Sequence, residues 1–125
     1  MDSFELSPHD IETLTHLQII SRLEIGDKIC TKSSQIQKNT YWTAYMRYMY
    51  GESRDTTIRF VKICVSRSLL LSKKPEIKDK VSEYLCQCIT GIENLIETYC
   101  GDIRIESELR NVLSTLERRG FKGEK

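Results

Sequence analysis

The clearest pattern in the chain is a narrow apolar stripe between residues 75 and 99. Its members recur every three or four positions, which is the period of one face of an α-helix. Pro75 and the acidic residues after it suit the positive first turn of a helix. We therefore expect a long helix over residues 75–99, buried through Ile77, Val81, Tyr84, Leu85, Cys88, Ile92, Leu95, Ile96 and Tyr99. Because a mid-helix glycine costs about 1 kcal/mol relative to alanine, Gly91 indicates close packing or a slight bend there.

A second amphipathic segment follows almost directly. Cys100-Gly101-Asp102 interrupts the periodicity and offers Asp102 as a cap for a new helix, which runs to about Arg119 before Gly120 ends it. The connection between these two helices is very short, so the pair must form an antiparallel hairpin.

Two earlier segments also have helical character. Ser7 and Pro8 open a first helix, and Gly26 either ends it or begins the turn after it. Its apolar residues recur every three positions and drift around the axis, so its buried side is not defined. A third helix, capped by Ser53 and ending near Ser72, is apolar over about half its circumference. That breadth predicts a central helix with more than one neighbour.

Between these helices the pattern is weaker. Residues 27–38 contain short, polar segments that tolerate extended structure, so a small β-hairpin or an ordered loop fits them. Residues 41–50 predict a short second helix with Trp42, Tyr45, Met46 and Met49 on one face. The whole chain, 1–125, is thus expected to be a single all-α domain, a compact bundle of about five helices, with 1–6 and 120–125 as flexible ends.

Composition agrees with a globular domain in a reducing compartment. Apolar residues make up 39% and charged residues 30% of the chain. No apolar run approaches the roughly 18–20 residues that cross a bilayer, and the acidic start does not resemble a signal peptide. The five cysteines (Cys30, Cys64, Cys86, Cys88 and Cys100) lack the pairing of a disulfide framework. We therefore expect free thiols in an intracellular protein that is neither secreted nor inserted in a membrane.

Charge is unevenly distributed although the net charge is only +1. Residues 54–74 carry six basic residues against Asp55 alone. On the third helix the arc outside the apolar face gathers Arg59, Lys62, Arg67, Lys73 and Lys74. This arc is either a basic element packed beside acidic ones or an anion-binding face.

No catalytic or metal signature emerges from the residues that carry such chemistry. Cys86 and Cys88 point about 200° apart on a helix, and His9 and His16 lie two turns, about 10 Å, apart, so neither pair suits one metal ion. No glycine-rich phosphate loop or nucleophile elbow is present. The sequence predicts surface histidines, buried or half-buried thiols, no enzymatic activity, no cofactor and no small-molecule substrate.

Residues 41–54 concentrate the residue types that are enriched at protein interfaces. A protein partner or a second copy of the chain is expected to contact Trp42, Tyr45, Arg47, Tyr48 and Arg54. Aromatic and basic residues also grip single-stranded nucleic acid, so the alternative is a nucleic-acid-binding accessory protein that uses the basic face of the third helix. The isoelectric point of about 7.6 favours the protein partner.

Several short motifs resemble one known group of proteins. They are Leu-Glu-Ile-Gly-Asp-Lys-Ile at 23–29, Trp42, Tyr50-Gly51-Glu52-Ser53-Arg54-Asp55, Gly91-Ile92-Glu93-Asn94-Leu95, Thr98-Tyr99 and Asp102. Their order is similar to that in small uncharacterised proteins of large nucleocytoplasmic DNA viruses, over roughly residues 14–118. The resemblance implies a non-enzymatic viral protein of the host cytoplasm or the virion, acting as a virion component or a host-directed factor.

The same resemblance implies four characteristic polar positions: Arg54, Asp55, Tyr99 and Asp102. Arg54 opens the third helix, while Tyr99 and Asp102 bracket the turn between the last two helices. We expect them to meet in one structural network in which Arg54 pairs with Asp102 and fixes the helix ends.

Overall fold

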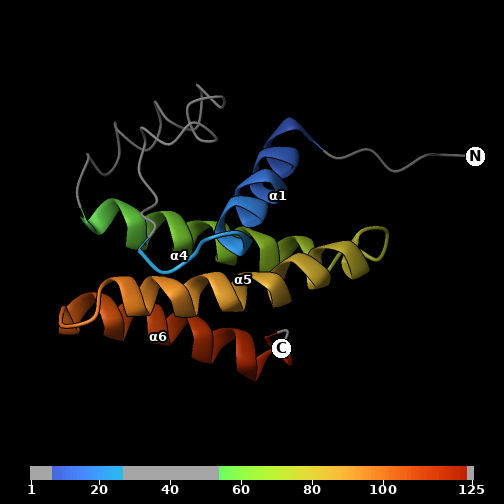
Figure 1. Ribbon diagram of the computed structural model, residues 1–125. Helices are drawn as coiled ribbons and strands as arrows, with labels where there is room; N and C mark the ends of the chain where they lie inside the picture. Colours follow the sequence, from blue (N-terminus) through green and yellow to red (C-terminus); the bar gives the residue numbers. More distant parts are fainter. Residues whose placement is uncertain (1–6, 27–53, 124–125) are drawn as a thin grey trace, which may run out of the picture.

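The computed structural model describes residues 7–26 and 54–123, which form four α-helices and no strand (Figure 1). The helices are α1 (Pro8–Ser21), α4 (Arg54–Leu71), α5 (Lys78–Thr98) and α6 (Ile103–Arg118). The predicted all-α class is therefore confirmed for this part of the chain. The predicted hairpin at 27–38 and the predicted helix at 41–50 lie outside the described residues.

Local capping chemistry sets the helix ends that the sequence predicted. The Ser7 Oγ accepts a hydrogen bond from the backbone N–H of Asp10 at 3.1 Å, and Pro8 occupies the first position of α1. Asp102 does the same for α6, accepting from the N–H of Ile105 at 3.2 Å. Gly120 follows α6 with a φ of 90°, a conformation that favours glycine.

Two predicted boundaries are wrong by a few residues. α5 begins at Lys78 instead of Pro75, because the chain needs residues 72–77 to reverse direction between α4 and α5. Within this connection the N–H of Ile77 bonds the carbonyl of Lys74 at 3.2 Å, a turn contact instead of a helical one. α1 ends at Ser21, well before Gly26.

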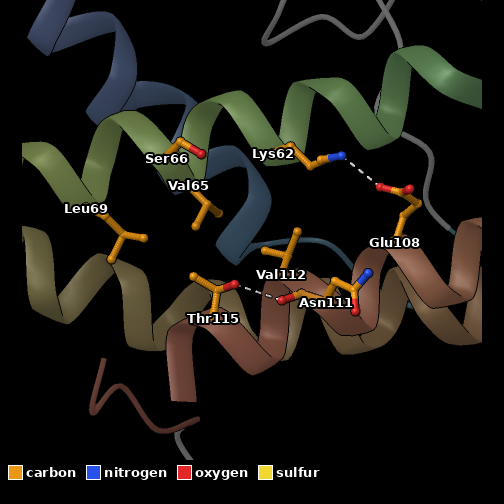
Figure 2. Close-up of a pocket in the computed structure, with 8 residues that line it drawn as sticks. All are labelled: Lys62, Val65, Ser66, Leu69, Glu108, Asn111, Val112 and Thr115. Atoms are coloured by element: carbon orange, nitrogen blue, oxygen red, sulfur yellow. Dashed lines mark hydrogen bonds and ion pairs between the residues drawn. The ribbon is translucent and has the colours of Figure 1, made fainter. Parts of the chain in front are cut away.

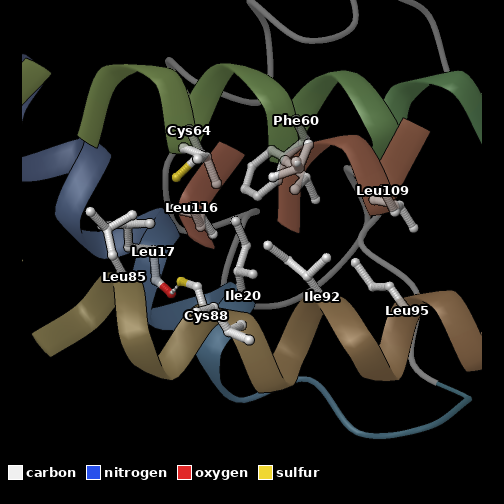
Figure 3. Close-up of a cluster of buried hydrophobic side chains, with 14 of the residues drawn as sticks. Leu17, Ile20, Phe60, Cys64, Leu85, Cys88, Ile92, Leu95, Leu109 and Leu116 are labelled. Carbon is white, nitrogen blue, oxygen red and sulfur yellow. Dashed lines mark hydrogen bonds between the residues drawn. The ribbon is translucent and has the colours of Figure 1, made fainter. Parts of the chain in front are cut away.

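The antiparallel hairpin of the last two helices is confirmed. In Figure 1, α5 runs opposite to both α4 and α6, so α4 and α6 are parallel neighbours, and α1 crosses α4 and α5. α4 contacts the other three helices, as predicted for a central element, and α5 shares that role. Figure 3 shows the core where the four helices meet, with Phe60, Leu17, Leu85, Leu95 and Leu116 among its completely buried side chains.

The docking of α1 explains why its apolar residues follow no single stripe. α1 packs against both α4 and α5, so its buried arc is wide. Polar contacts fix the same docking on the α5 side: Gln18 donates to the Tyr84 hydroxyl at 2.9 Å, and Asn94 donates to the carbonyl of Leu23 at 2.8 Å. The backbone N–H of Gly26 donates to the Thr98 hydroxyl at 2.7 Å.

α1 and α5 approach each other closely at Gly91. A Cβ atom placed on Gly91 would overlap the carbonyl group of Ile20. The absent side chain therefore lets the end of α1 lie directly on α5. The close packing expected at this glycine is confirmed.

We expect Asp102→Ala to lower the free energy of unfolding by about 1 kcal/mol, because the N–H of Ile105 then loses its acceptor. Asp102→Asn keeps a side-chain oxygen at the cap and should have a much smaller effect. Urea titration followed by circular dichroism compares the two variants. Equal losses would show that Asp102 acts through its charge instead of through capping.

Candidate functional site

His16 is buried, so the prediction that both histidines lie on the surface is wrong for it. The residue is 1% exposed, and its ring packs edge-on against Phe60 of α4, with ring centroids 5.1 Å apart. Burial lowers the pKa of His16 to about 4, with the backbone of Glu12 opposing and the nearby Arg67 adding to this change. His9 is exposed, as predicted. The sequence held a signal for His16, since Thr13, Leu17 and Ile20 place it on the buried arc of α1.

Two thiols lie in the core beside α1. Cys64 of α4 donates to the carbonyl of Thr13 at 3.6 Å, and Cys88 of α5 donates to the carbonyl of Leu17 at 3.1 Å. Burial raises the pKa of Cys64 to about 12, and burial together with the neighbouring Cys64 raises the pKa of Cys88. Because the reactive species is the thiolate, both groups are poor nucleophiles. Cys86 is half-buried, as expected, whereas Cys100 is exposed, so the expectation of buried or half-buried thiols is wrong for Cys100.

Among the four described thiols, we expect iodoacetamide at pH 8 to modify Cys100 first, Cys86 more slowly, and Cys64 and Cys88 only after denaturation. The reason is that burial both shields the last two thiols and suppresses their thiolates. Peptide mapping by mass spectrometry follows each site separately. Native-state alkylation of Cys64 as fast as that of Cys100 would contradict this packing.

The predicted polar network is described only in part. The Tyr99 hydroxyl lies 3.4 Å from the Thr57 hydroxyl and so links the end of α5 to the first turns of α4. Asp102 caps α6. Arg54 and Asp55 belong to the first turn of α4, but their side chains lie outside the described residues, so the Arg54–Asp102 pair stays a prediction.

The predicted partner-binding residues Trp42, Tyr45, Arg47 and Tyr48 also lie outside the described residues. Their role stays a prediction.

The five residues of the predicted basic arc, three on α4 and two in the turn after it, have different surroundings. Lys62 pairs with Glu108 of α6 at 2.8 Å, whereas Lys74 pairs with Asp10 at the start of α1 at 3.3 Å. Arg67 is half-buried and acts electrostatically on His16 and Cys64, on the side of α4 that faces α1. Lys62 and Arg67 leave the helix about 140° apart. The basic arc, which also includes Arg59 and Lys73, is thus divided between two edges of α4.

A groove runs along the edge of α4 that faces α6. Its volume is about 280 Å³, and it is lined by Lys62, Val65, Ser66 and Leu69 of α4 and by Glu108, Asn111, Val112 and Thr115 of α6. Val65, Leu69 and Val112 are buried and apolar, and they form its floor. Exposed or half-buried polar side chains form its rim. Figure 2 shows the Lys62–Glu108 ion pair spanning one end of the groove.

Cationic side chains lie at both ends of this groove. Lys62 holds the pKa of Glu108 below its usual range, and Arg104 and Arg59 lower it further. At the other end Arg118 donates to the Thr115 hydroxyl at 3.3 Å. Among the side chains that the structure describes, Lys62, Arg59 and Arg104 thus act on Glu108 at one end, and Arg118 lies at the other. Sequence reasoning missed Arg104, Glu108 and Arg118 here because it could not tell that α4 and α6 are neighbours.

Within residues 7–26 and 54–123, no three His, Cys, Asp or Glu side chains are grouped so that they could hold a metal ion. In the same part of the chain, no helix has the length and apolar character needed to cross a membrane.

Comparisons with known proteins place no relative beside this chain. No protein-family model, curated protein or solved structure matches it.

Proposed function

We propose that this chain is a non-enzymatic protein-interaction module whose working surface is the groove between α4 and α6. The observation that carries the proposal is the make-up of that groove: a buried apolar floor of Val65, Leu69 and Val112 inside a polar rim. Protein interfaces have this anatomy, with an apolar centre surrounded by solvent-exposed polar groups.

The open shape of the groove favours a partner's side chains over a metabolite. Small-molecule sites typically enclose about 300–1,000 Å³ and bury most of their ligand. This groove has about 280 Å³ and is open to solvent along the helices. One or two apolar side chains from a protein segment fill such a volume.

The burial of two thiols and one histidine also supports a non-enzymatic role. Cys64 and Cys88 are buried thiols with raised pKa values, and His16 packs in the core against Phe60. These three groups are inaccessible to a substrate. They contribute to the docking of α1.

The motif resemblance adds a biological setting to the proposal. It favours a protein of a large DNA virus that acts in the host cytoplasm or the virion, either as a virion component or as a host-directed factor. A second copy of the chain remains one of the partners that the groove would accept.

Site-specific photocrosslinking tests the proposed surface. A photoreactive residue replaces Ser66, which is exposed on the groove rim, or Ser114, which is exposed on another arc of α6 and serves as the matched control. In cells that express the full chain, we expect a discrete protein adduct from position 66 and none from position 114. An adduct of twice the chain mass would identify a second copy. No protein adduct at position 66, or equal adducts at both positions, would refute the proposal.

A further inference from the structure

We propose that His16 is an acid-sensitive latch for α1: when its ring takes up a proton, α1 leaves α4 and α5, while α4, α5 and α6 stay folded together. The latch lies between α1 and α4, where the His16 ring meets Phe60. It is separate from the groove, which lies on the edge of α4 that faces α6.

α1 lies on three helices that contact one another without it. α4, α5 and α6 each contact the other two, whereas α1 crosses α4 and α5 from one side (Figure 1). The turn at residues 99–102 also joins α5 directly to α6. α1 can therefore detach without breaking any contact among the other three helices.

The contact between α1 and α4 is polar for a protein core. Among the side chains that the structure describes, four polar ones are buried, and Thr13 and His16 of α1 are two of them. A third, Ser68, lies on α4 one turn after Cys64 and donates to its carbonyl at 2.7 Å. The thiols of Cys64 and Cys88 donate to backbone carbonyls of α1 (Figure 3). Because buried polar groups stabilise a core less than apolar ones do, the attachment of α1 depends on the state of these groups.

His16 is the member of this set whose charge changes in mild acid. It is buried edge-on against Phe60, where no water can solvate a charged ring. Arg67 of α4 acts on the same ring and repels a second positive charge. The backbone of Glu12 has the opposite effect, but burial outweighs it, and the pKa of His16 falls to about 4.

The other titratable groups that reach α1 are poorly suited to balance a positive His16. α4 brings the Cys64 thiol, and α5 brings the Cys88 thiol and the Tyr84 hydroxyl. These groups carry no negative charge in acid. The ion pair between Asp10 and Lys74 lies at the exposed start of α1. Protonation of His16 therefore weakens the docking of α1.

The size of the effect follows from proton linkage. A released α1 exposes His16 to water, where it takes up a proton at its ordinary pKa of 6.5, whereas the docked ring does so only at about 4. Docking is thus fully supported above pH 6.5 and loses support as the pH falls towards 4. Between pH 6.5 and pH 4.5 the ratio of released to docked α1 rises about fortyfold. Release uncovers the faces of α4 and α5 that carry Phe60 and Gly91.

Thiol labelling at two pH values tests the latch, because Cys64 and Cys88 lie beneath α1. The full chain is treated with 4,4′-dithiodipyridine, an aromatic disulfide that labels thiols in acid as well as at neutral pH. Peptide mapping by mass spectrometry follows each site, and each rate is divided by that of the exposed Cys100 in the same sample. We expect the relative rates of Cys64 and Cys88 to rise about fortyfold from pH 6.5 to pH 4.5.

Three variants identify the titrating group. His16→Leu and His16→Gln both lack an ionisable ring, so each should show a rise of less than about threefold. His9→Leu removes the exposed histidine of α1 and is the matched control, which should keep the full rise. Circular dichroism shows which variants are folded. A rise of the wild-type size in either folded His16 variant would overturn the latch.

Hydrogen exchange of the full chain distinguishes release of α1 from unfolding of the whole domain. A helix of 14 residues is only marginally stable alone, so the amides of a released α1 exchange with solvent. From pH 6.5 to pH 4.5 we expect the protection factors of α1 to fall about fortyfold and those of α6 to fall less than about threefold. Equal losses in α1 and α6, or unchanged protection in α1, would overturn the proposal.

Discussion

Gly91→Ala is expected to lower the free energy of unfolding by about 3 kcal/mol, the upper end of the usual cost of overpacking. The added methyl group would overlap the carbonyl of Ile20, which is backbone and cannot rotate away. Alanine stabilises an ordinary helix by about 1 kcal/mol relative to glycine, so the sign of the change is itself informative. Chemical unfolding followed by circular dichroism measures the difference.

Thr90→Ala is the matched control, because Thr90 is the exposed neighbour of Gly91 on α5. It should alter stability by no more than about 0.5 kcal/mol. If Gly91→Ala stabilised the protein instead, α1 would not be docked against α5 at this point.

Acidification from pH 6.5 to pH 4 is expected to remove about 3 kcal/mol of stability through His16 alone. Burial lowers the pKa of His16 from 6.5 to about 4 in the folded chain. Between these two pH values, His16 is mostly protonated in the unfolded chain and mostly neutral in the folded chain. The stabilising effect of the neutral ring is complete above the unfolded pKa. It is lost as the pH falls towards the folded value.

His16→Leu should remove most of this slope, because the substituted side chain is apolar and does not titrate. Urea unfolding at half-unit pH intervals gives the comparison between wild type and variant. Glu108 contributes in a different window: its pKa is lowered by Lys62, so its contribution is present above its usual pKa and is lost only at more acidic pH. An unchanged slope between pH 6.5 and 4.5 in His16→Leu would mean that His16 is solvated in the folded protein.

The ends of the helices could be predicted where capping is local. Ser7, Pro8, Asp102 and Gly120 each act through their own backbone neighbourhood, and the structure places them as expected. The start of α5 could not be fixed this way, because Pro75 is compatible with a helix start and with a turn alike. Residues 72–77 form a turn because the chain must reverse direction between α4 and α5, and this is a requirement of the tertiary structure.

The buried side of α1 and the candidate groove depend on which helices are neighbours. The apolar residues of α1 face two helices, so no single periodicity describes them. The basic arc predicted outside the apolar face of the third helix is divided in the structure. Arg67 lies on the side of α4 that faces α1, whereas Lys62 pairs with Glu108 of α6. Arg104 and Arg118 become part of the groove only because α6 lies parallel to α4.

Stability and binding are expected to be separable in this fold. His16 and Gly91 secure the docking of α1 on α4 and α5, whereas the groove lies on the edge of α4 that faces α6. Substitutions on the groove rim, such as Ser66→Trp, should therefore change binding without a comparable loss of stability.

Amide chemical-shift mapping by NMR tests the groove most directly. The ¹⁵N-labelled full chain is titrated with the protein that the crosslink at position 66 captures, and the shift of each backbone amide is followed. We predict that the largest shifts cluster in residues 62–69 of α4 and 108–115 of α6, with little change along the exposed side of α5. Largest shifts outside these two segments would contradict the assignment of the groove as the working surface.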